Sequence, residues 1–145
     1  MPEPSLAQLV AAGLLQTKPP DPRRVRAWAE RSRRDLELAQ SVLAAIDADR
    51  AMAVAYEAGY RACAGLIDLA GYRVTSQPGH QRAALDATLA RLGEERRSLL
   101  RRMDRARRFR NESLYGDVPR ASAGELEQLM KDAAALLERV ELALG

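Results

Sequence analysis

The residues best suited to chemistry lie in the stretch RRFRNESLYGD, which spans residues 107–117. Arg110, Asn111 and Tyr115 supply a guanidinium, an amide and a phenol close together in the chain. A planar guanidinium donates paired hydrogen bonds to phosphate oxygens and keeps its charge at physiological pH. We therefore expect this stretch to bind an anionic group, phosphate in particular, with Glu112 as a secondary member of the site.

The same stretch closes a basic helix that we expect to begin near Glu94 and to end within residues 113–116. Apolar residues recur on this helix at steps of three and four, which places them on one face. These residues are Leu99, Leu100, Met103 and Ala106. Arg110 continues the inward line, and a buried unpaired charge is costly. We expect Arg110 to meet either a ligand phosphate or a carboxylate of the chain, such as Glu57 or Asp68.

Arginines also follow the opposite face of this helix. From residue 91 to residue 110, nine arginines stand against three acidic residues, which is a local excess of six positive charges. Such a row of charge can track the phosphates of a nucleic acid, and it can equally be an ordinary solvated surface. The row on this face consists of Arg97, Arg101, Arg105 and Arg108. The residues that we predict to bind nucleic acid are Arg101, Arg105 and Arg108 of this row, together with Arg107.

Packed helices must position these side chains. The chain has 145 residues, of which 47% are hydrophobic and only 4% aromatic, and such a composition favours helices over sheet. No segment has the period-two alternation of a strand. Apolar periodicity and capping signals predict helices near residues 6–14, 22–47, 49–70, 80–92, 94–116 and 122–140. The predicted fold class is all-α, an up-and-down bundle of five or six helices.

We expect these helices to form a single domain. In this interpretation residues 1–20 are an N-terminal docking helix and its linker, and residues 21–145 are the bundle. The helix of residues 49–70 is the central one, because its packing face consists of small residues that let neighbouring helices approach closely. Asp49 is its expected N-cap.

The sequence lacks several motifs for metal binding, catalysis and membrane insertion, and their absence limits the functions that we expect. It contains one cysteine, Cys63, and one histidine, His80, so we expect no metal site and no cofactor. It carries no glycine-rich phosphate loop and none of the motifs HExxH, CxxC or GxSxG. No apolar run reaches membrane-spanning length, and the first ten residues lack the positive region of a secretory signal. We expect a cytoplasmic protein that has no membrane partner.

Two parts of the sequence resemble HEPN domains. Residues 55–76, followed by the Gly-His pair at residues 79–80, resemble the central helix and following loop of that family. Arg110 and Asn111, followed by Tyr115, resemble the family motif, which is an Arg, a polar residue, and a His four to six residues beyond the Arg. Tyr115 stands where the motif has its His.

The resemblance extends over about residues 27–140 and implies an RNA-acting helical bundle that forms a homodimer. Many HEPN domains are metal-independent ribonucleases, often toxins that are paired with a nucleotidyltransferase-like antitoxin. By that resemblance, Arg110 would hold the scissile phosphate and Asn111 would orient it. Tyr115 would donate a proton or position a phosphate, since a phenol with a pKa of about 10 is a poor base at neutral pH.

Three interpretations stay open on the sequence. The first, which we prefer, is a HEPN-type endoribonuclease or toxin component that works through a dimeric groove. The second is a non-catalytic HEPN module that binds a nucleotide or a nucleotidyltransferase antitoxin, and the replacement of the motif His by Tyr115 favours it. The third is a plain interaction bundle in which Arg110 pairs with a carboxylate that is sealed inside the subunit.

Overall fold

The structure, a computed structural model, describes residues 3–113 and 121–145. Its elements are α1 (Leu6–Ala11), β1 (Leu15–Thr17), α2 (Pro22–Leu38), the π-helical segment η1 (Ala39–Leu43), α3 (Ala44–Ile46), α4 (Ala48–Leu69), β2 (Tyr72–Val74), α5 (His80–Leu92), the 3-10 turn η2 (Glu94–Arg96), α6 (Arg97–Ser113) and α7 (Ala123–Leu144). Because α2, η1 and α3 form one continuous helical run, the described residues contain six helices, and the predicted all-α bundle is confirmed. None of these helices combines the length and the apolar character that a membrane crossing requires.

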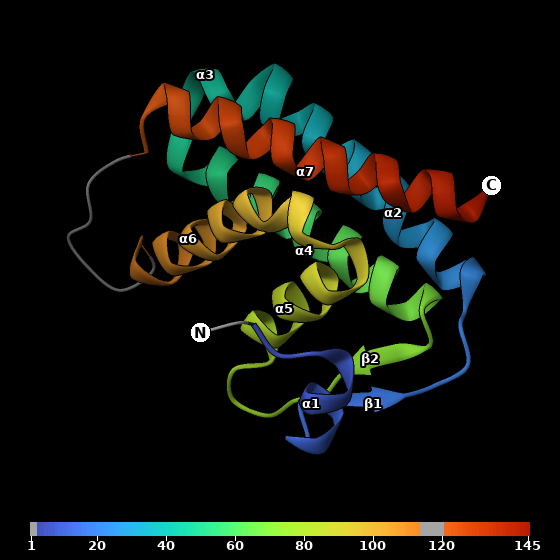
Figure 1. Cartoon of the computed structure of the whole chain (residues 1–145). Helices are drawn as coiled ribbons and strands as arrows, with labels where there is room; N and C mark the ends of the chain where they lie inside the picture. The colour runs from blue at the N-terminus through green and yellow to red at the C-terminus, as the bar shows by residue number, and fades with distance from the viewer. Residues whose placement is uncertain (1–2, 114–120) are drawn as a thin grey trace.

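Helix α4 is the centre of the bundle. It lies between the pair α2 and α7 and the pair α5 and α6, and it contacts all four (Figure 1). At Gly59 a Cβ atom would lie 2.7 Å from Cε of Met103 on α6 and 3.2 Å from Cβ of Ala133 on α7. The missing side chain therefore lets both helices approach α4 closely. The prediction that this small-residue helix is the central one is confirmed.

The first turn of α4 differs from the prediction. Asp47 is the N-cap, because its backbone is non-helical and its carboxylate accepts a hydrogen bond from the N–H of Arg50 at 3.1 Å. The prediction of Asp49 as the cap is wrong. Asp49 lies inside the first turn, and its carboxylate accepts the N–H of Ala121 at 2.9 Å, which ties the chain just before α7 to the start of α4.

The segment before α2 packs against one end of the bundle. Strands β1 and β2 pair antiparallel, with Leu15 opposite Val74, and Lys18 pairs with Asp68 of α4 at 2.5 Å. A small apolar cluster joins this segment to α4 and α5, and it consists of Leu9, Leu15, Ile67, Ala83, Ala84 and Ala87. The strand pair corrects the sequence analysis, because three-residue strands are too short to show a period-two pattern. The division of the chain at residue 20 stays a prediction.

Candidate functional site

Helix α6 is held by an apolar face and by an ion pair. The four residues predicted to face inward, Leu99, Leu100, Met103 and Ala106, are all buried. On another side of the helix, Arg102 donates two hydrogen bonds to the carboxylate of Asp132 on α7, at 2.7 and 2.9 Å. These contacts give the arginines near the end of α6 a fixed support.

Arg110 lies one turn beyond this buried face and reaches toward α4. Its Nη2 atom lies 2.9 Å from Oε1 of Glu57, which is one of the interactions that Arg110 makes. The partner is thus one of the two carboxylates predicted, whereas Asp68 pairs with Lys18. Because 28% of the Arg110 side chain and 46% of the Glu57 side chain are exposed, the pair is not sealed inside the subunit. Both groups can be reached by a ligand.

A cleft of about 270 Å³ opens beside this pair, and we call it the Arg110 cleft. Residues of α2, α4, α5 and α6 line it: Trp28, Tyr56, Glu57, Tyr60, Arg61, Ala64, Gln81 and Arg110. The lining joins flat aromatic rings with two guanidinium groups and a carboxylate. Aromatic faces stack on nucleobases and guanidinium groups bind phosphates, so the combination suits one nucleotide unit.

The two tyrosines of the cleft are one helical turn apart on α4. Their ring centroids are 6.1 Å apart, and the buried Tyr56 hydroxyl donates a hydrogen bond to Oε1 of Gln81 at 3.3 Å. Burial raises the pKa of both phenols, most strongly that of Tyr56. Both phenols therefore stay protonated at neutral pH, and they act in the cleft as neutral hydrogen-bonding groups.

Arg61 forms a fixed part of the wall. Its Nη1 atom lies 3.0 Å from Oδ2 of Asp35 and 3.2 Å from Oγ of Ser32, both on α2. Ser32 is fully buried and donates a hydrogen bond to the carbonyl of Ala58 on α4. These hydrogen bonds join α2 to α4 beside the cleft. They therefore help to fix the positions of Trp28 on α2 and Tyr60 on α4.

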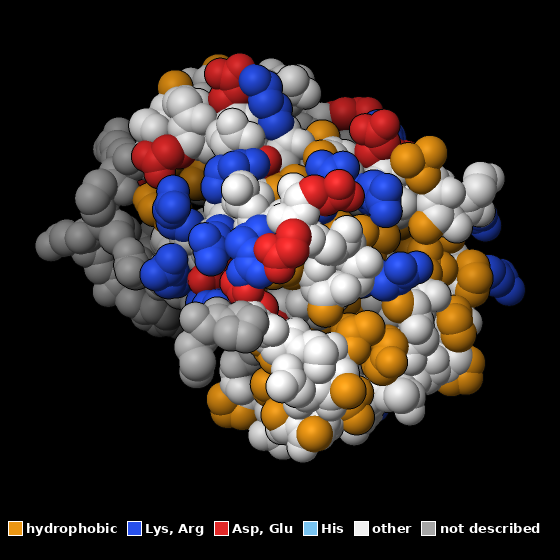
Figure 2. Space-filling model, viewed as in Figure 1, with side chains coloured by type: hydrophobic (Ala, Val, Ile, Leu, Met, Phe, Trp, Pro, Cys, Tyr) orange, Lys and Arg blue, Asp and Glu red, His pale blue; other side chains and the backbone are white. Residues whose placement is uncertain are grey.

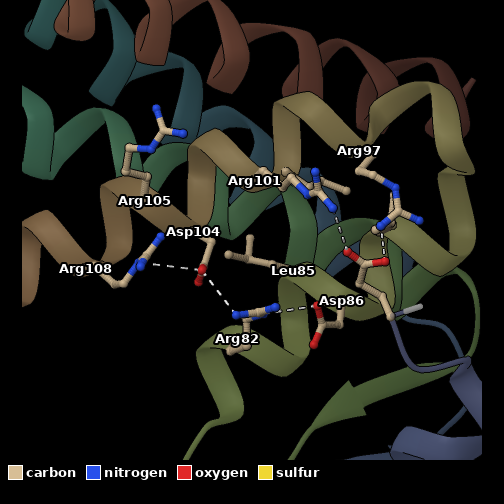
Figure 3. A pocket seen from close by; sticks show the side chains of 11 residues that line it. Arg82, Leu85, Asp86, Arg97, Arg101, Asp104, Arg105 and Arg108 are labelled. Carbon is tan, nitrogen blue, oxygen red and sulfur yellow. Dashed lines mark hydrogen bonds and ion pairs between the residues drawn. The ribbon is translucent and has the colours of Figure 1, made fainter. Parts of the chain in front are cut away.

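A second hollow, of about 350 Å³, lies between α5 and α6, and we call it the basic groove. Lys and Arg side chains gather over α6 with acidic side chains among them (Figure 2). The charged residues that line the groove are Glu3, Arg82, Asp86, Arg97, Arg101, Asp104, Arg105 and Arg108. Arg82 bridges Asp86 and Asp104, at 3.2 Å to each (Figure 3). Five arginines against three carboxylates leave the groove positively charged.

Comparison with known protein families identifies the fold. The family model described as HEPN domain matches residues 25–143. The chain belongs to the HEPN family. No curated protein and no solved structure is significantly similar to it. Membership of the HEPN family gives the protein a role connected with RNA or with nucleotides.

The predicted site residues of this HEPN domain separate into two groups. Arg110 lines the Arg110 cleft, and Asn111 beside it is exposed. Tyr115 lies outside the described residues, as does the side chain of Glu112. Arg101, Arg105 and Arg108 line the basic groove instead.

Arg107, the remaining residue predicted to bind nucleic acid, is tied to its own helix. Its Nε atom donates a hydrogen bond to Oδ1 of Asp104 at 2.9 Å, and only 21% of its side chain is exposed. Asp104 also pairs with Arg82 and Arg108. Arg107 therefore helps to fix a carboxylate that lines the basic groove.

Sequence reasoning did not assign several residues that the structure brings to the two hollows. Trp28 and Tyr60 flank the Arg110 cleft, and Arg82 and Glu3 line the basic groove. The one available signal for the cleft is the four-residue spacing of Tyr56 and Tyr60, which places both rings on one face of a helix. The other residues come from segments far apart in the sequence, so their meeting depends on tertiary packing.

The single cysteine and the single histidine of the chain are residue types that often bind metals or act in catalysis, and neither lines one of the two hollows. Cys63 is buried in the core, where desolvation raises the pKa of its thiol to about 12 and keeps it uncharged. His80 begins α5, and its Nδ1 lies 3.1 Å from the carbonyl of Gln77. In the described part of the chain, no three His, Cys, Asp or Glu side chains are grouped so that they could hold a metal ion.

Proposed function

We propose that this HEPN protein acts on RNA through the Arg110 cleft, as a metal-independent endoribonuclease or toxin component. The observation that carries the proposal is the accessible guanidinium of Arg110 beside Trp28 and Tyr60, in a cleft of about 270 Å³. Arg110 binds a phosphate of the strand, and the neighbouring base lies against the aromatic side chains. Asn111 orients the same phosphate.

The cleavage that this arrangement serves needs no metal ion. The ribose O2′ attacks the neighbouring phosphorus, the bond from phosphorus to O5′ breaks, O2′ loses its proton and O5′ gains one. Arg110 stabilises the negative charge that develops on the phosphate oxygens. Glu57 lies within reach of a group bound to Arg110, and a carboxylate there accepts the proton of O2′. Tyr115 replaces the motif His as the proton donor to O5′.

We also propose that the working form is a homodimer. HEPN domains often dimerise, and the motif helices of the two subunits then face each other across a groove. A dimer would place two Arg110 clefts near one RNA strand. Light scattering of the purified protein should give twice the mass of the 16.0 kDa chain, and a mass of one chain would contradict the dimer.

A second candidate is a non-catalytic HEPN module that binds a nucleotide or a nucleotidyltransferase antitoxin. Two observations favour it. Tyr115 stands where the motif has its His, and Glu57 already accepts a hydrogen bond from Nη2 of the Arg110 guanidinium. In this form the cleft binds the phosphate and the base without any bond being broken.

Cleavage of single-stranded RNA in EDTA separates the two candidates. We expect cleavage by the wild-type protein, a loss of about 100-fold or more in Arg110→Ala, and no loss in Arg34→Ala. Arg34 is exposed on α2 and lines neither hollow, so that variant controls for the removal of one positive charge. If only Tyr115→His cleaves, the natural protein is the binding module. Equal cleavage by a folded Arg110→Ala protein would remove the proposed site.

A further inference from the structure

The basic groove contains two sets of charges with different partners. Arg82 pairs with Asp86 and Asp104 on the helices that form the groove, and Arg108 lies 3.8 Å from Asp104 (Figure 3). These charges are balanced by carboxylates of α5 and α6 themselves. They fix the two helices to each other and belong to the wall of the groove.

Arg97 and Arg101 are different, because the acid between them comes from the start of the chain. Glu3 accepts a hydrogen bond from Nη1 of Arg97, and its other oxygen lies 3.8 Å from Nη2 of Arg101. Only 16% of the Glu3 side chain is exposed. A carboxylate that bridges two guanidinium groups takes the position that two oxygens of a phosphate would take.

Arg97 and Arg101 are positioned to bind another anion when Glu3 is displaced. Arg97 also donates two hydrogen bonds to the carboxylate of Glu94, one of them at 2.6 Å, so its side chain has a second support in the turn η2 that precedes α6. The Arg101 side chain is 66% exposed and lies one turn further along α6. Glu3, by contrast, stands before the first helix, on a segment that has no regular secondary structure.

The basic groove and the Arg110 cleft both include residues of α5 and α6. Gln81 lines the cleft and the next residue, Arg82, lines the groove, so both hollows reach the first turn of α5. On α6 the groove arginines lie on a different face from Arg110, and Arg97 and Arg110 are about 20 Å apart along the helix at the helical rise per residue. An extended single strand of several nucleotides spans that distance, so a strand with its scissile phosphate at Arg110 is long enough to reach Arg97 and Arg101.

We propose that Arg97 and Arg101 form a second phosphate site for the RNA strand, and that Glu3 occupies this site in the free protein. The strand and Glu3 then compete, so the N-terminal segment limits RNA binding. This inference rests on the proposed function for the nature of the ligand, but it concerns residues outside the Arg110 cleft. The hydrogen bond from Arg97 lowers the pKa of Glu3 below its usual range, so Glu3 is ionised at neutral pH and competes as an anion.

The test compares two variants that each remove one negative charge. Glu3→Gln weakens the competitor, whereas Glu127→Gln removes an exposed carboxylate of α7 that pairs with Lys131. We measure the dissociation constant of a fluorescently labelled single-stranded RNA of about twelve nucleotides, a length that covers both hollows. We expect Glu3→Gln to bind about fivefold more tightly than wild type, which is the effect of one ion pair. Glu127→Gln should match the wild type.

Arg101→Gln supplies the opposite change. It should weaken binding by at least the same factor and should reduce the dependence of binding on salt by about one counterion. Equal affinities for Glu3→Gln and Glu127→Gln, or an unchanged affinity in Arg101→Gln, would overturn the second phosphate site.

Including Arg110→Ala separates this inference from the proposed function. Loss of binding in Arg110→Ala without any effect of Glu3→Gln contradicts only the second site. An effect of Glu3→Gln without any effect of Arg110→Ala supports the second site and contradicts the role of Arg110. If neither the wild type nor Glu3→Gln binds RNA, both proposals fall.

Discussion

Arg110 of α6 and Glu57 of α4 face each other at the mouth of one cleft, with Nη2 and Oε1 2.9 Å apart. The pairing matters because nearly half of the Glu57 side chain is exposed. A partly exposed ion pair contributes little to stability, so the carboxylate can give way to a stronger anionic ligand. Glu3, whose side chain is less exposed, likewise pairs with Arg97 and Arg101. In both hollows, a carboxylate of the chain itself occupies a place suited to phosphate.

Neutralising Glu57 should strengthen the binding of RNA while it weakens cleavage. In Glu57→Gln the amide no longer competes with phosphate as an anion, and we expect the dissociation constant to fall about fivefold, as for one exposed ion pair. The same variant lacks the proposed proton acceptor, so single-turnover cleavage should slow by about 100-fold or more. The binding control is Glu127→Gln. Weaker binding in Glu57→Gln would mean that Glu57 orients Arg110 and does not compete with the ligand.

Trp28 should report on the occupation of the Arg110 cleft. It is the only tryptophan of the chain and lines that cleft, with the guanidinium carbon of Arg24 6.0 Å from its ring centroid. Stacking of a base on the indole should quench its emission with the same midpoint that fluorescence anisotropy gives for RNA binding. The control is Trp28→Phe, which has no tryptophan and should show no such change in emission. An emission that stays constant when anisotropy shows saturation would place the RNA elsewhere.

The ion pair between Arg102 and Asp132 should be important for stability and should have no direct part in binding. Asp132 is only 4% exposed and also accepts a hydrogen bond from Gln128. Asp132→Ala leaves Arg102 and Gln128 without this partner, and we expect the free energy of unfolding to fall by about 2 kcal/mol. Urea unfolding is the measurement.

The matched control for that prediction lies on the same helix. Glu127 and Lys131 form an ion pair in which both side chains are 68% exposed. We expect Glu127→Ala to change the free energy of unfolding by less than about 0.5 kcal/mol. Similar losses in Asp132→Ala and Glu127→Ala would show that the burial of Asp132 does not set the strength of its pair.

Most of the fold could be predicted from the sequence because helices depend on local patterns. The apolar steps of α6 and the small residues of α4 are visible in any window of a few turns. The strand pair was missed, because three-residue strands are held by partners far away in the chain. The prediction of Asp49 as N-cap was also wrong, because an Asp side chain suits a cap at either position and the non-helical backbone lies at Asp47.

The candidate site could be predicted only where one helix supplies it. Arg110 and its carboxylate partner follow from the inward face of α6, since a charge placed there requires an opposite charge nearby. The rest of the cleft depends on packing, because Trp28 belongs to α2 and Gln81 to α5. Glu3 is the extreme case: it meets Arg97 across 94 positions of sequence, and no local pattern in the chain indicates that contact.

The measurement that tests the central claim most directly is the affinity of Arg110→Ala for single-stranded RNA. Fluorescence anisotropy at fixed salt should show binding at least about tenfold weaker than wild type, which is the loss expected for one charge-assisted phosphate contact. Arg34→Ala should bind like the wild type, and circular dichroism should show that both variants are folded. Equal weakening in the two variants, or none in Arg110→Ala, would contradict a phosphate site at Arg110.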